Sequence, residues 1–165
     1  MKKVLFLLLL LSLIACGNDL DETNSFIESF NENAYEFTGV GLIDVNNLEN
    51  IRQEKNGKWR RLYESKFYTL EAKYNDNEKL TGYNLSIDKN QAYEKMEGFG
   101  YEATLVLIKT LGLDREEFNK YYQKSLEDED LETVVYVENG YEITLINFMF
   151  GKEYNGMVIN IDLLD

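Results

Sequence analysis

The sequence predicts an α+β fold in which an antiparallel sheet carries helices packed on one of its faces. Apolar residues recur at helical spacing in two stretches of the chain, and strand-like alternation follows each stretch. Asn139-Gly140, the strongest turn signal in the chain, joins two strand-like segments as a two-residue hairpin turn does. Because the order of helix and then strands occurs twice, the fold is predicted as α+β with the alternative of two helix–sheet repeats.

The first half of the chain predicts one helix followed by strands. Residues 21–34 place apolar side chains three and four positions apart, which is typical of an amphipathic helix. Residues 35–45 and 58–88 are rich in aromatic and β-branched residues and predict antiparallel strands. Asn56-Gly57 precedes the second of these groups and is a candidate hairpin turn.

The second half predicts two helices and then three strands. Residues 90–111 have one apolar side, which includes Phe99 and Leu107, and are interrupted by two glycines. Gly112 is typical of a residue that ends a helix, and Asp114 with Glu117 resembles the capping pair that begins the next one. The strands are expected at residues 132–138, 141–150 and 156–164.

Two short segments in the two halves have similar patterns. Residues 82–88 are GYNLSID and residues 156–162 are GMVINID, so each begins with glycine and ends with an Ile-Asp pair. Each also follows another predicted strand. A duplication would explain the similarity, but strands this short also repeat such patterns by chance, and chance is the favoured explanation.

The N-terminus, MKKVLFLLLLLSLIAC, has the layout of a secretory signal peptide. Two lysines precede an apolar run, and a small residue, Ala15, stands before Cys16. The run is shorter than the roughly 20 apolar residues that cross a bilayer comfortably. We therefore predict a signal peptide over residues 1–15.

Cys16 is the only cysteine, and the chain has no histidine, so a disulfide or a Cys/His metal site lacks its second ligand. Leu13-Ile14-Ala15-Cys16 resembles the lipobox of bacterial lipoproteins. The resemblance implies that Cys16 is diacylated and becomes the first mature residue. Because two acyl chains hold a protein where one is marginal, it implies a lipid-anchored protein on the extracytoplasmic face of the cell membrane.

The domain organisation predicted behind Cys16 is simple. Residues 16–22 form the lipidated cysteine and a polar tether, and residues 23–165 form a single α+β domain. The whole is similar to small lipoproteins of unknown function from low-GC Gram-positive bacteria and their prophages, which implies no catalytic residues. Besides the lipobox, this wider resemblance is carried by FIESFNENA at 26–34, KWRRLYESKF at 58–67, LIKTLGLD at 107–114 and GMVINID at 156–162.

Composition argues against several classes of function. A net charge of −13 disfavours nucleic acid and polybasic membrane binding. No catalytic triad, zinc site or phosphate-binding loop can be assembled, so we expect no enzyme, no cofactor and no metal. The chain has so many Asp and Glu residues that the sequence cannot identify a catalytic carboxylate pair among them. The acidic run over residues 127–130 lacks the spacing of an EF-hand, and a solvated loop is favoured over a calcium site.

Aromatic residues are the remaining indication of function. Twelve Tyr and nine Phe exceed what a small core needs, and Tyr is favoured at protein interfaces. The alternative is that these rings fill the core between helices and sheet. The candidate interface residues are Trp59, Tyr63, Tyr68, Tyr121 and Tyr122.

The expected function is that of a membrane-anchored protein-binding or inhibitory module, with prophage-encoded exclusion or immunity at the cell surface as one role. A contiguous exposed aromatic patch would support this hypothesis, and a fully polar sheet face would contradict it. The alternative is a small-ligand or cation-binding lipoprotein, which requires an enclosed pocket or an acidic cage.

Overall fold

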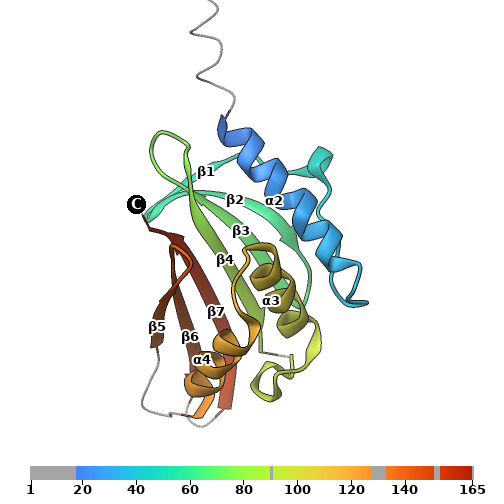
Figure 1. Ribbon diagram of the computed structural model, residues 1–165, viewed down its shortest axis with the longest axis vertical. Coiled ribbons are helices and arrows are strands. Elements are labelled where there is room, and N and C mark those ends of the chain that lie inside the picture. The colour runs from blue at the N-terminus through green and yellow to red at the C-terminus, as the bar shows by residue number, and fades with distance from the viewer. Residues whose placement is uncertain (1–17, 90, 128–132, 151–152, 165) are drawn as a thin grey trace, which may run out of the picture.

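A computed structural model describes residues 18–89, 91–127, 133–150 and 153–164. These residues contain one antiparallel sheet in the order β1-β2-β3-β4-β7-β6-β5, and the helices cover one of its faces (Figure 1). The α+β prediction is confirmed. The elements are α2 (Asn18–Ala34), β1 (Arg52–Glu54), β2 (Gly57–Glu64), β3 (Tyr68–Tyr74), β4 (Leu80–Asp88), α3 (Gly98–Thr110), α4 (Arg115–Glu127), β5 (Thr133–Glu138), β6 (Tyr141–Phe150) and β7 (Glu153–Leu163), with 3-10 turns η1 (Val45–Asn47) and η2 (Tyr93–Lys95).

Alternation along the strands separates a buried face from an open face. Every second residue of β3, from Tyr68 to Tyr74, is buried, while the residues between them are partly exposed on the other side. From α2, Ile27 and Phe30 enter the same core, and the ring of Phe26 stacks on Tyr83 with centroids 4.0 Å apart. The helices therefore pack on the face that alternation predicts.

Two predictions for the first half are wrong. α2 begins at Asn18, so most of the predicted tether over residues 16–22 belongs to this helix, while Cys16 lies outside the described residues. Residues 35–44 form a loop rather than a strand. The amide of Asn31 explains the path of this loop, because its Oδ1 accepts from the backbone N–H of Ile43 at 2.8 Å and its Nδ2 donates to the Ile43 carbonyl at 2.9 Å.

The two predicted hairpin turns have different outcomes. Asn139 and Gly140 have φ angles of +48° and +80°, as the predicted type I′ turn requires. The first hairpin turns one residue earlier than expected, because Glu54 pairs with Gly57 and leaves Lys55 with Asn56 as the loop. Gly57 is the first residue of β2 and takes the positive φ, +130°.

The helix boundaries of the second half follow local capping chemistry. Gly112, with φ of +67°, ends α3, and the backbone N–H of Leu113 donates to the Ile108 carbonyl at 3.0 Å. Asp114 caps α4, because its Oδ1 accepts from the backbone N–H of Glu117 at 2.8 Å. The predicted helix over residues 90–111 is shorter than expected, since α3 begins only at Gly98, after the 3-10 turn η2.

The two similar segments lie side by side at the centre of the sheet. Gly82 pairs with Asp162, Asp88 pairs with Gly156, and Leu85 lies opposite Ile159. This register relates β4 to β7 by an approximate two-fold axis between the strands. The strand order extends the relation, because β3 and β2 on one side correspond to β6 and β5 on the other. The arrangement supports the repeat alternative.

The glycines of the two segments occupy equivalent bulges. The ladders leave one unpaired residue just before Gly82 and just before Gly156. A Cβ atom on Gly82 would overlap the Ile161 carbonyl oxygen, and one on Gly156 would lie 2.9 Å from the Ile87 carbonyl oxygen. Only glycine fits where β4 and β7 approach each other so closely. The geometry that the two halves share therefore has a steric cause.

Replacing Leu107 tests the packing of α3. Leu107 is fully buried in the core, so Leu107→Ala is expected to lower the free energy of unfolding by about 2–5 kcal/mol through lost contacts and a cavity. Leu164→Ala is the matched control, because Leu164 is 47% exposed. Urea denaturation of both variants measures the difference. A loss below about 0.5 kcal/mol for Leu107→Ala would mean that this helical face is assigned wrongly.

Buried tyrosines make stability dependent on alkaline pH. Burial raises the pKa of Tyr83 and Tyr122 above the ordinary value, and neighbouring tyrosines add to this. Above about pH 10 the unfolded chain loses phenolic protons that the folded chain keeps. Below pH 10 these tyrosines therefore do not change the free energy of unfolding with pH. At higher pH each such group lowers it by about 1.4 kcal/mol per pH unit.

Urea denaturation between pH 9 and pH 11 measures this slope. Tyr122→Phe removes one buried phenol and is expected to reduce the slope by about 1.4 kcal/mol per pH unit. Tyr35→Phe is the control, because the Tyr35 ring is 77% exposed and folding does not bury its hydroxyl. Equal slopes for Tyr122→Phe and the unaltered chain would refute the assignment.

Candidate functional site

Of the five aromatic residues expected at an interface, two are buried in the core and three are half-buried at the surface. Tyr68 and Tyr122 are 2% and 0% exposed and belong to the core, so their prediction as interface residues is wrong. The Tyr122 hydroxyl donates to the Tyr93 carbonyl oxygen at 3.3 Å, which satisfies it inside the protein. Trp59, Tyr63 and Tyr121 are half-buried and lie on separate parts of the surface.

Tyr121 holds α4 against the edge of the sheet. Its ring stacks on Tyr136 of β5 with centroids 4.1 Å apart and an interplanar angle of 7°. The ammonium of Lys120 lies 5.1 Å from the Tyr121 centroid and covers its outer side. This contact explains the half-buried state of Tyr121 by packing, without a partner.

Trp59 lies on the open face of the sheet, among charged residues. It pairs across the ladder with Lys73, whose ammonium lies 5.4 Å from the indole centroid. Lys73 also forms an ion pair with Asp162 of β7. The Trp59 ring thus lies under charged side chains and is not part of an aromatic patch.

An aromatic cluster lies where the loop that follows α2, the β2–β3 turn and the start of α3 meet. Phe67 meets Phe99 edge to face with centroids 4.6 Å apart, and Tyr63 stacks on Tyr68 at 5.0 Å. The sequence predicts Phe99 on the apolar side of a helix over residues 90–111. Because α3 begins at Gly98, Phe99 instead lies in its first turn, 37% exposed.

The loop over residues 35–44 lies directly on these rings. A Cβ atom on Gly39 would overlap the Phe99 ring, and one on Gly41 would overlap the Tyr63 ring. The Gly41 backbone N–H donates to the Tyr68 hydroxyl at 3.2 Å. The two glycines therefore let the backbone touch aromatic rings, and the hydrogen bond fixes the contact.

The result is an apolar surface in a fixed conformation. Tyr35 is 77% exposed and Leu42 is 46% exposed on the same loop, which Gly39 and Gly41 hold against the rings of Phe99 and Tyr63. We call this set the distal aromatic surface, because it lies at the opposite end of α2 from Asn18 (Figure 1). It consists of Tyr35, Leu42, Tyr63, Phe67 and Phe99.

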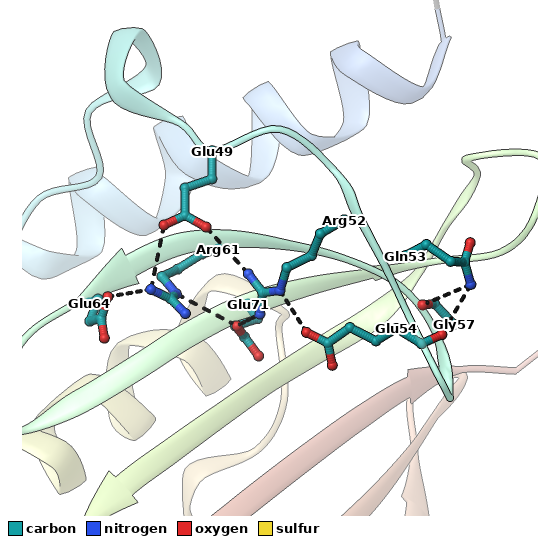
Figure 2. A network of polar contacts seen from close by, with 8 residues as sticks. All are labelled: Glu49, Arg52, Gln53, Glu54, Gly57, Arg61, Glu64 and Glu71. Carbon is teal, nitrogen blue, oxygen red and sulfur yellow. Dashed lines mark hydrogen bonds and ion pairs between the residues drawn. The ribbon is translucent and has the colours of Figure 1, made fainter.

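A charged network covers the open face over β1, β2 and β3. Figure 2 shows Arg52 and Arg61 side by side, with Glu49 bridging them at 3.4 Å from each guanidinium. Glu71 lies between the two arginines from the sheet, paired with Arg52 and 3.8 Å from the Nε of Arg61. Glu54 lies 2.6 Å from the Nε of Arg52, and the hydrogen bonds that Arg52 donates to Glu54 and Glu71 raise its pKa.

This network pairs both guanidinium groups with carboxylates and makes the open face over β1 to β3 mainly polar. Arg61 also pairs with Glu64, so both guanidinium groups are surrounded by carboxylates. The polar character continues to the centre, where Asn84 donates to Asn160 at 2.7 Å. The open face therefore has a polar half, although β5 and β6 expose Val135, Val137 and Phe148 on the other half.

The surface also has open grooves. One of about 820 Å³ lies beside the first turns of α2, lined by residues that include Glu22, Tyr83, Tyr141 and Leu164. It is open to solvent, whereas the small-ligand alternative requires an enclosed pocket. Within the described part of the chain, no three His, Cys, Asp or Glu side chains gather as a metal site would need.

Comparisons of the chain with models of protein families, with curated proteins and with solved structures found no match. None of the described helices combines the length and the apolar character that a membrane crossing requires. The fold and surfaces described above are therefore the basis for any statement about function.

Proposed function

We propose that the protein is a lipid-anchored extracytoplasmic lipoprotein whose domain binds another protein and acts as an interaction or inhibitory module. The observation that carries this proposal is the distal aromatic surface. Aromatic side chains on rigid backbone give a large contact area with little loss of conformational entropy on binding. The glycine contacts under residues 35–44 provide this rigidity before any partner arrives.

The position of the lipobox-like sequence in the chain is compatible with a binding role for this surface. α2 begins two residues after Cys16 and has 17 residues, which corresponds to a length of about 25 Å. The distal aromatic surface lies at the far end of this helix from the lipid attachment point. An anchor at Cys16 would thus leave the surface free to meet a partner in the envelope, such as one involved in exclusion or immunity.

Crosslinking in intact cells tests the binding surface. Leu42→Ser is expected to lower the yield of a specific crosslinked partner at least about tenfold, because it removes an exposed apolar contact. Leu164→Ser is the matched control, since the two leucines are 46% and 47% exposed. Equal yields from the two variants would contradict a role for the distal aromatic surface. Recovery of no partner from the unaltered chain would favour the small-ligand alternative instead.

Changing Cys16→Ser tests the anchor. The serine variant lacks the thiol that the lipid would be attached to, so it is expected to leave the membrane fraction or to accumulate as an uncleaved precursor. Detergent phase partitioning and the electrophoretic mobility of the product measure this change. Cys16→Ser protein that partitions like the unaltered chain would refute the lipobox interpretation, without affecting the distal aromatic surface.

A further inference from the structure

The two-fold arrangement of the sheet leaves one position vacant. β2 and β5 are equivalent strands at the outer sides of the two halves. β1 pairs with the outer edge of β2, but among the described residues no strand pairs with the outer edge of β5. Figure 1 shows β5 at the border of the molecule, with its outer edge uncovered by any drawn helix. The position beside β5 is therefore a vacant strand site by comparison with the first half.

The chemistry of β5 differs from that of a protected edge strand. Natural edges are blunted by shortness, charge, proline or a bulge. β1 is such an edge, because it has only three residues, Arg-Gln-Glu, and its Arg52 pairs with Glu54 of the same strand and Glu71 of β3. β5 has six residues, Thr-Val-Val-Tyr-Val-Glu, and an uninterrupted register with β6. Its edge is thus regular, rich in β-branched residues and open to a further strand.

The type I′ turn determines which backbone groups point outward. Residues that flank a two-residue hairpin turn form a hydrogen-bonded pair, and such pairs alternate along the ladder. Glu138 pairs with Tyr141 across the turn, so Val137, Val135 and Thr133 direct their N–H and C=O groups away from β6. Val135 and Val137 are 51% and 62% exposed on the open face of the sheet.

The two faces of β5 present different chemistry to an added strand. On the open face, the exposed side chains of Val135 and Val137 lie opposite Thr144 and Glu142 of β6. On the helix side, Oε2 of Glu138 and the hydroxyl of Tyr136 are buried without a hydrogen-bond partner among the described residues. Burial, and then the carboxylates of Glu138, Glu117 and Asp114, raise the pKa of the Tyr136 hydroxyl. The helix side is therefore electronegative, although Lys120 pairs with Glu117.

We infer that β5 accepts an extended segment of a partner protein that pairs with its outer edge and alternates β-branched with basic residues. The β-branched side chains lie on Val135 and Val137, and the basic side chains face the carboxylates on the helix side. A second copy of this chain fits less well, because it brings the same acids to the edge and a net charge of −13. This site is separate from the distal aromatic surface and from Cys16.

A labelled peptide, Lys-Val-Lys-Val-Thr-Val-Lys-Val-Lys, is the probe for this site. Fluorescence anisotropy with the full-length protein in detergent is expected to show saturable binding. Val135→Pro removes an outward N–H without removing a ladder bond, whereas the matched Val135→Thr keeps it. We expect at least tenfold weaker binding to the proline variant and unchanged binding to the threonine variant. Leu42→Ser is expected to bind the peptide normally, which separates this site from the distal aromatic surface.

The peptide itself supplies controls that do not depend on the folding of a variant. Methylation of alternate backbone amides preserves its charge but blocks pairing, and is expected to weaken binding at least tenfold. Glutamate in place of lysine is expected to have the same effect. No saturable binding, or equal binding of the methylated peptide, would overturn the inference. A dimer of the chain that Val135→Pro abolishes would assign the edge to a second copy instead.

Discussion

The pairing of β4 with β7 is the contact on which the rest of the structure depends. These strands join the two halves of the sheet, and Gly82 and Gly156 let them approach at their ends more closely than other residues would allow. Leu85 and Ile159, opposite each other at the centre, are fully buried under the helices. A side chain at either glycine would force the halves apart and open the core that they share.

This pairing also explains why the two ends of the sheet differ in chemistry. The same arrangement of strands occurs on both sides of the axis, but the first half adds β1 and the charged network around Arg52 and Arg61. The second half lacks these additions and keeps a valine-rich edge at β5. Most of the distal aromatic surface also belongs to the first half, because its loop follows α2, and Phe99 of α3 is its one residue from the second half. The two proposed binding surfaces thus lie where the two halves differ. The strands that the halves share form the stable core of the sheet.

Much of the fold could be predicted from the sequence, because local physical chemistry determines it. Apolar spacing located the helices, Gly112 and Asp114 marked the turn between α3 and α4, and Asn139-Gly140 specified a hairpin. Residues 35–45 were misjudged, because aromatic and β-branched residues also occur in loops that pack on a core. The loop is fixed by contacts of Asn31 with Ile43, twelve residues away, and no local pattern reveals such a pairing.

The candidate site was harder to predict, because exposure of an aromatic ring depends on tertiary contacts. Tyr122 and Tyr121 are adjacent on α4, yet the first is fully buried and the second lies half-exposed on Tyr136. Spacing alone gives both the same preference for an interface. Phe99 was assigned to a buried helical side, and only the start of α3 at Gly98 shows that it lies near solvent. The pairs of rings come from different elements, so their meeting is a property of the topology.

The central position of β7 has a consequence for how the chain reaches this structure. β7 follows every other described element in the chain, yet it lies between β4 and β6 in the sheet. During synthesis, β1 to β4 can pair before β7 emerges, but β4 then presents an open apolar edge. β5 and β6 likewise have no place beside β4 until β7 is inserted. The sheet is therefore completed late, and the half-formed sheet is the state most prone to self-association.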